Sequence, residues 1–195
     1  MSQLSTLGFL SPDGRSYSFD FRANGYGKGE GLGMMVLKRM DDAIRDGDTI
    51  RAVIRSTAIN QDGRTPGITQ PSIKAQTDNI QQAYQAADLS LEYTRYFEAH
   101  GTGTAVGDPF EAEAIHTAFQ RKLDNPLYIG TLKASIGHLE AGAGIAAMIK
   151  SVLVLENGIL PPNAGFERHN PAIPVEDWSL RVGSVLSFGT YPHIS

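Results

Sequence analysis

The chain has 195 residues and a 41% hydrophobic content, which suits one sizeable globular domain. Its net charge of −4 and pI near 5.7 give no basic footprint, so nucleic acid is not an expected partner. No run of about 18 apolar residues occurs and residues 1–4 do not resemble a signal peptide, so we expect a cytoplasmic chain without membrane partners. The absence of cysteine excludes disulfides, thiolate metal sites and thiol catalysis by these residues.

The first third of the chain is predicted to be mostly irregular. Residues 1–33 give no helical or strand period, and residues 11–14 (Ser-Pro-Asp-Gly) are a strong turn signal. The apolar residues 34–37 predict a short buried strand, and residues 41–45 predict one or two helical turns. Residues 50–59 are rich in β-branched side chains and predict a second strand.

Helices and strands alternate in the rest of the chain. Ser72 is a plausible N-cap for a helix that reaches residue 87, and residues 95–99 predict a strand that ends at His100. Residues 108–111 (Asp-Pro-Phe-Glu) have the spacing of a capping box at the start of another helix.

A further strand and helix complete the pattern. Residues 127–132 predict a strand leading to His138, and residues 141–156 predict a helix that Gly158 ends. The small residues at its start indicate close packing, so we expect this last helix to be buried. The alternation predicts α/β layers with a mostly parallel sheet.

His100 and His138 are the main candidates for chemistry. Each lies where a predicted strand gives way to a glycine-containing turn, and such strand ends collect ligands in α/β folds. An imidazole there can donate a hydrogen bond to an oxygen that gains charge, and Lys133 is close enough in sequence to bias one of them. From the residues alone, satisfied loop histidines and a solvated lysine remain the alternative.

Other residues give weaker evidence for a functional site. The glycine-rich residues 25–33 and 101–107 lack a dinucleotide or phosphate-loop fingerprint, which leaves a dinucleotide site as a weak alternative. No third ligand has metal-site spacing, so no metal is expected. We expect His116 on the surface, and His169 and His193 in loops without a role.

Several motifs, in the same order along the chain, resemble the ketosynthase (beta-ketoacyl synthase) domain of type I polyketide synthases. They are residues 19–20, 23–26, 29–31, 60–69, 98–104, 107–109, 133, 136–138 and 161–163. The resemblance covers about residues 7–182, and residues 51–55 and 60–69 look most like fungal highly reducing synthases.

The resemblance implies a fold and a reaction. The fold would be the C-terminal half of a thiolase-like α-β-α-β-α layered domain, with an irregular linker region at 1–33, the half-fold at 34–182 and a divergent tail at 183–195. The reaction would be decarboxylative Claisen condensation of acyl and malonyl thioesters. Its substrates are carried on the phosphopantetheine of an acyl carrier protein, no cofactor is bound to the domain, and intact family members are homodimers.

The resemblance also implies roles for particular residues. His100 and His138 would support decarboxylation and stabilise the enolate or condensation oxyanion, with Lys133 supporting them. Thr102 and Thr104 would line the pantetheine tunnel. Phe188 would bind substrate in a turn near the oxyanion hole, although Pro192 replaces a glycine of that turn.

The family's nucleophilic cysteine has no counterpart in these 195 residues. We therefore expect a truncated ketosynthase fragment that is inactive alone. The alternative is a non-catalytic half-domain that docks onto a partner bearing the cysteine. In either case the face that such a partner covers is expected to be apolar, which favours association and poor solubility.

Overall fold

The computed structural model describes residues 2–67, 70–183 and 186–187. The helices are α1 (Ser2–Thr6), α2 (Met40–Asp46), α3 (Ile73–Ala86), α4 (Gly107–Phe119), α5 (Lys133–Ile136) and α6 (Ala143–Asn157), with single 3₁₀ turns at Leu91–Tyr93 and Glu140–Gly142. The strands are β1 (Tyr96–Glu98), β2 (Leu127–Gly130), β3 (Ile159–Leu160), β4 (Leu180–Val182) and β5 (Leu186–Ser187). No helix of the described part is long and apolar enough to cross a membrane.

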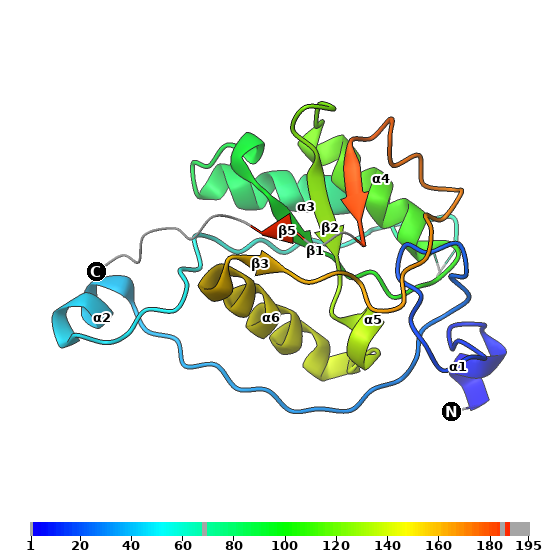
Figure 1. The fold of residues 1–195 in the computed structure, drawn as a ribbon, viewed down its shortest axis with the longest axis horizontal. Coiled ribbons are helices and arrows are strands. Elements are labelled where there is room, and N and C mark those ends of the chain that lie inside the picture. The colour runs from blue at the N-terminus through cyan, green and yellow to red at the C-terminus, as the bar shows by residue number, and fades with distance from the viewer. Residues whose placement is uncertain (1, 68–69, 184–185, 188–195) are drawn as a thin grey trace.

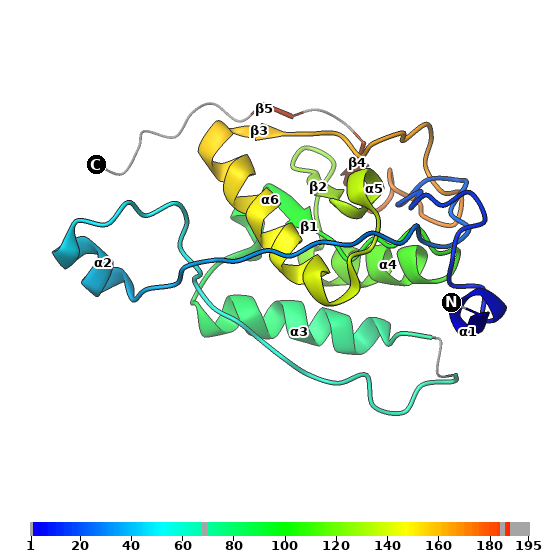
Figure 2. The same cartoon turned by 90° about the horizontal axis from the view of Figure 1, so that it is seen from below.

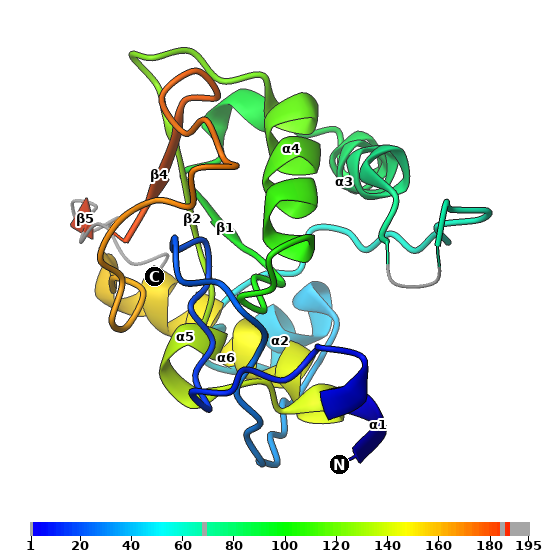
Figure 3. The ribbon, with the colours of Figure 1, turned by 90° about the vertical axis from the view of Figure 1, so that its right-hand side faces the viewer.

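A three-stranded parallel sheet forms the centre of the molecule. Its order is β1-β2-β4, with Phe97 opposite Ile129 and Ile129 opposite Val182. Helix α4 lies against this sheet, and α3 packs on the outer side of α4 (Figure 3). The shared core includes Ile115 of α4 and Leu127 of β2, both fully buried. The expected α/β architecture with a mostly parallel sheet is confirmed.

Local signals set several element ends correctly. The Ser72 hydroxyl accepts a hydrogen bond from the Ala75 amide at 3.1 Å, as an N-cap of α3 should. Helix α6 ends where Gly158 takes a left-handed conformation, with φ of 63°. The predicted turn at residues 11–14 closes through a 3.1 Å bond from the Gly14 amide to the Ser11 carbonyl.

The two strands predicted at residues 34–37 and 50–59 are absent, and these expectations are wrong for this chain. Both segments run extended past the body of the molecule without a strand partner among the described residues (Figures 1 and 2). Val36 is 99% exposed and Ile59 is 89% exposed. A strand requires a neighbour to pair its amides and carbonyls, and strand propensity alone does not supply one.

Helix α6 is less buried than its small residues suggested. Only Lys150 and Val154 of its fifteen residues are buried, and the large apolar side chains Leu153 and Leu155 are at least half exposed. Its first turns are covered by the extended segment that carries Gly33, where an added Cβ would lie 2.3 Å from the Ile145 side chain. Another side of α6 faces β1, where Lys150 pairs with Glu98, and the exposed apolar side chains lie on the rest of its surface.

Candidate active site

The His100 loop is held by a carboxylate from α4. His100 lies two residues after the end of β1, and the amides of His100 and Gly101 donate to the two oxygens of Glu111 at 2.6 and 2.7 Å. Gly101 has φ of 44°, and a Cβ there would lie 2.8 Å from the Thr131 side chain. Glu111 therefore fixes the backbone that presents the imidazole.

Asp108 performs a similar task one turn earlier and corrects the capping-box prediction. Its carboxylate, 1% exposed, accepts the Phe19 amide at 2.7 Å and the Gly103 amide at 3.0 Å. Helix α4 begins at Gly107, and no side chain at its N-cap residue bonds to it. Asp108 thus joins the distant Phe19 backbone to the loop that precedes α4, and burial raises the pKa of Asp108 to about 7 against the effect of these amides.

Lys133 lies at the start of α5, just beyond the end of β2. Its side chain is 6% exposed, which is unusual for lysine. Burial lowers the pKa of its amine, while the carboxylates of Glu111, Glu98 and Asp108 act in the opposite direction. The alternative of a solvated surface lysine is therefore excluded, and Lys133 is part of a buried charge cluster.

The alternating glycines form a strip that holds both histidine loops. The His138 amide donates to the Gly27 carbonyl at 2.7 Å, and the Gly29 amide donates to the His138 carbonyl at 3.1 Å. Two residues earlier, the Gly25 amide donates to the Gly103 carbonyl at 2.9 Å. A Cβ on Gly27 or Gly29 would lie 2.3 Å from a carbonyl oxygen, so only glycine permits this approach.

The ring of His138 has a defined hydrogen-bonding state. Its Nδ1 accepts a 3.0 Å hydrogen bond from the Glu140 amide, so the neutral imidazole carries its proton on Nε2. Burial lowers the pKa of His138, and the nearby Lys133 lowers it further. The ring is therefore neutral at pH 7 and offers an N–H donor.

The two imidazoles lie edge to face. Their centroids are 5.3 Å apart with an interplanar angle of 86°, and Tyr26 flanks His138 at 5.0 Å. Desolvation, followed by the charge of Lys133 and by His138, lowers the pKa of His100 to about 4. His100 nevertheless keeps an exposed surface. The structure thus brings His100, His138 and Lys133 together, on the segments that follow the carboxyl ends of the adjacent parallel strands β1 and β2.

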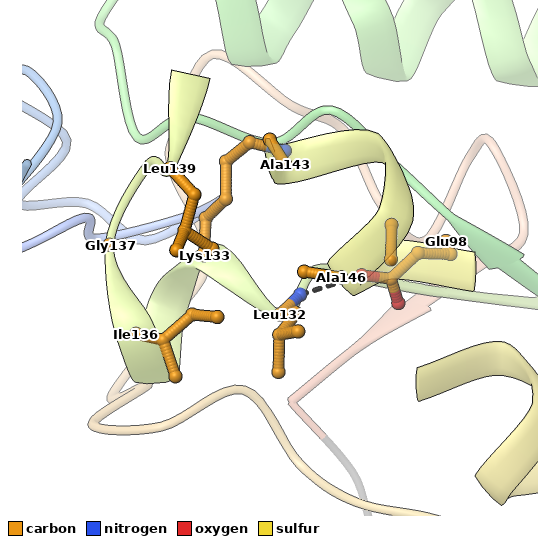
Figure 4. Close-up of a pocket in the computed structure, with 9 residues that line it drawn as sticks. Glu98, Leu132, Lys133, Ile136, Gly137, Leu139, Ala143 and Ala146 are labelled. Atoms are coloured by element: carbon orange, nitrogen blue, oxygen red, sulfur yellow. Dashed lines mark hydrogen bonds between the residues drawn. The ribbon is translucent and has the colours of Figure 1, made fainter. Parts of the chain in front are cut away.

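The two threonines expected to line the pantetheine tunnel differ in burial and hydrogen bonding. Thr102 is buried, whereas the Thr104 hydroxyl oxygen accepts the Gly107 amide at 3.1 Å and closes the turn into α4. Phe188 lies outside the described residues. A small pocket beside Lys133 is lined by Glu98 of β1, by Leu132, Lys133, Ile136, Gly137 and Leu139, and by Ala143, Ala146 and Ala147 of α6 (Figure 4).

The remaining histidines lie away from this site. His116 is half-buried, not on the surface, because its ring stacks on Trp178 at 5.2 Å. His169 packs against Phe166, and His193 lies outside the described residues. Across the described ranges no three His, Asp or Glu side chains are placed to share a metal ion.

Comparison with known families gives this site a context. Residues 51–167 match the family model described as "Beta-ketoacyl synthase, C-terminal domain", and residues 1–43 match "Beta-ketoacyl synthase, N-terminal domain". The chain belongs to the beta-ketoacyl synthase family. The two matches adjoin between residues 43 and 51, while our division at residue 33 stays a prediction.

Fungal relatives narrow the resemblance. This beta-ketoacyl synthase chain is 62% identical over 180 residues to "Highly reducing polyketide synthase 40" of Fusarium mangiferae, covering 91% of the chain and 7% of that protein. It is 59% identical to "Highly reducing polyketide synthase NEC1" of Pyricularia oryzae, covering 91% of the chain and 6% of that protein. The chain therefore spans a small part of the curated relatives it matches.

Solved ketosynthase structures share the fold. The oxazolomycin ketosynthase domain OzmH KS7 of Streptomyces albus JA3453 matches with a TM-score of 0.90 and 40% identity, over 95% of this chain and 33% of that one. The ketosynthase from module 6 of the Bacillus subtilis 168 bacillaene synthase matches with a TM-score of 0.92 and 41% identity, over 98% and 35%. The predicted ketosynthase resemblance and thiolase-like fold are confirmed.

Proposed function

We propose that this chain supplies the histidine-bearing part of the condensation site of a highly reducing polyketide synthase. The observation that carries the proposal is the pair of neutral imidazoles 5.3 Å apart, on the loops that follow β1 and α5. Because His138 accepts at Nδ1, its Nε2–H is free to point at a substrate oxygen. Donors placed where negative charge develops are the main source of rate in acyl-transfer chemistry.

In the proposed reaction, the bond from the malonyl α-carbon to its carboxylate breaks and CO₂ leaves. The electron pair moves to the thioester, whose oxygen becomes an enolate stabilised by hydrogen bonds from His100 and His138. The carbanion then attacks the acyl thioester carbon, and a thiolate leaves as the new carbon–carbon bond forms. Neutral imidazoles suit this role, since they donate to the oxygen without quenching the carbanion by proton transfer.

The substrates would reach the site on the phosphopantetheine of an acyl carrier protein. We infer that buried Thr102 lines the path of this arm. The Thr104 oxygen already accepts the Gly107 amide, so Thr104 would contact the arm through its hydroxyl proton. A role for Phe188, cytoplasmic location and homodimeric assembly remain predictions.

The cysteine thiol that takes up the acyl group would come from outside these residues, because the 195 residues contain no cysteine. We expect the purified chain neither to take up an acyl group from a labelled thioester nor to release CO₂ from a malonyl thioester. Turnover by the homogeneous chain would overturn the proposed division of the site.

A second function, as a half-domain that docks onto a cysteine-bearing companion, has support of its own. The extended segments 32–37 and 50–59 expose apolar side chains, including Leu32, Met34, Val36 and Ile59. Large apolar side chains exposed along two extended segments support an interaction surface there.

The experiment combines the chain with a companion half. We would use the part of the Fusarium mangiferae relative that precedes the region matched here, and measure CO₂ release from malonyl thioester. His100→Ala or His138→Ala should lower the rate of the complex about 100-fold or more. His116→Ala is the matched control, because His116 stacks on Trp178 away from the site. Full activity of a His100→Ala/His138→Ala complex would contradict the proposed roles.

A further inference from the structure

A buried ion pair lies next to Lys133. The Lys150 ammonium of α6 contacts the Glu98 carboxylate of β1 at 2.7 Å, and both side chains are less than a tenth exposed. The Tyr96 hydroxyl accepts from Lys150 at 2.7 Å and donates to Glu98. The other Glu98 oxygen accepts the Leu132 amide at 2.6 Å (Figure 4). One carboxylate thus joins β1, α6 and the turn that carries Lys133.

Stability alone is a poor reason for such a pair. Removing two charges from water costs about as much as their attraction returns, and apolar replacements of similar volume often do as well. Lys150 also lies on a helix whose other side is largely exposed. A lysine on that side would have kept its ammonium in water. The inward placement of the charge therefore calls for a role at the site.

We propose that Glu98 and Lys150 are positioning residues for Lys133. Glu98 holds the backbone one residue before Lys133 through the Leu132 amide. Glu98 and Lys133 line the same small pocket, and the Lys150 ammonium is held on the Glu98 carboxylate at 2.7 Å. The inference rests on the proposed function, in which Lys133 supports the two histidines.

The other groups around Lys133 define what the pair contributes. Glu111 and Asp108 face it from α4, and the imidazoles of His100 and His138 face it from their loops. Among these, Glu98 raises the pKa of the Lys133 amine and Lys150 lowers it. Removing the Glu98 charge alone should therefore lower the pKa of Lys133, and removing the Lys150 charge alone should raise it. Removing both charges should leave this pKa nearly unchanged.

The first experiment measures protonation of Lys133 in the full chain by NMR with labelled lysine side chains, assigned through Lys133→Arg. Glu98→Gln should increase the acid dissociation constant of Lys133 about threefold or more, and Lys150→Met should decrease it by a similar factor. The double variant should lie near the wild type. Lys74→Met, in the exposed Lys74–Asp78 pair, is the control and should leave it unchanged. Loosening of the fold would move both single variants in the same direction, which would overturn the proposal.

The second experiment separates position from charge through hydrogen exchange of the Leu132 amide. Glu98→Gln keeps an oxygen acceptor for this amide, so its protection should persist, whereas Glu98→Leu should speed exchange at least tenfold. Equal protection in both variants would refute the backbone role. Neither readout depends on turnover, so a failure here is distinguishable from loss of condensation in the reconstituted complex. If Glu98→Leu does not fold, the opposite shifts expected of Glu98→Gln and Lys150→Met still decide the proposal.

Discussion

Val36→Lys tests whether the exposed extended segment is a docking surface. The Val36 side chain is 99% exposed in the chain alone, so its replacement removes no packing. We expect the free energy of unfolding of the chain to change by less than about 0.5 kcal/mol. If a companion half buries this side chain, about 1.5–3 kcal/mol of apolar burial is lost. That weakens binding about 10- to 150-fold, with a further cost for burying an ammonium.

The assay has two arms. Chemical denaturation measures the stability of the chain, and analytical ultracentrifugation measures its association with the companion half. Val154→Lys is the matched control, because Val154 of α6 is buried within the chain and its replacement should lower the chain's own stability by several kcal/mol. Our reasoning is refuted if Val36→Lys destabilises the chain as Val154→Lys does, or if it leaves the association constant unchanged.

Three further predictions concern the described site and its supports. Gly29→Ala should lower the free energy of unfolding by more than about 1 kcal/mol, because its Cβ would lie 2.3 Å from the Ile136 carbonyl oxygen. Gly144→Ala, whose Cβ would have no atom within 4 Å, should raise the free energy of unfolding by about 0.4–1 kcal/mol. Urea denaturation measures both changes. Burial raises the folded-state pKa of Asp108 from 3.8 to about 7, so the stability it contributes is complete below pH 3.8 and is lost as the pH rises to about 7; Asp108→Asn should flatten that part of a pH series of denaturation curves. The pKa of His100 falls from 6.5 to about 4 on folding, so its contribution is complete above pH 6.5 and is lost as the pH falls toward 4. An NMR titration midpoint near 6.5 would count against this.

The sequence located the site because strand ends and turns are local signals. His100 and His138 follow short apolar runs, and both runs became strands of one parallel sheet. That adjacency placed the two imidazoles at the same sheet edge. Lys133 was also identified from the sequence, but its burial was not, because its neighbours include Glu111 of α4 and the alanines of α6 that line the adjoining pocket.

The supporting carboxylates were misread for a physical reason. Asp108 and Glu111 have the spacing of a capping box, and only the folding of residues 100–103 and Phe19 over α4 gives their oxygens other donors. Glu98 was seen as part of a motif, but its bonds to Leu132 and Lys150 span 34 and 52 residues of chain. The strand predictions for residues 34–37 and 50–59 were wrong for the same reason. Strand formation depends on a neighbouring strand that the local sequence does not specify.

Backbone hydrogen bonds from the glycine strip help to set the distance between the two imidazoles. Gly25 bonds to the His100 loop and Gly27 to His138, so the gap between the two anchor points is one two-residue repeat of extended backbone. Side-chain evolution along this strip has no means of adjusting that gap. A single residue inserted or deleted between Gly25 and Gly27 would shift one anchor relative to the other, so the number of residues between them is as constrained as their identity.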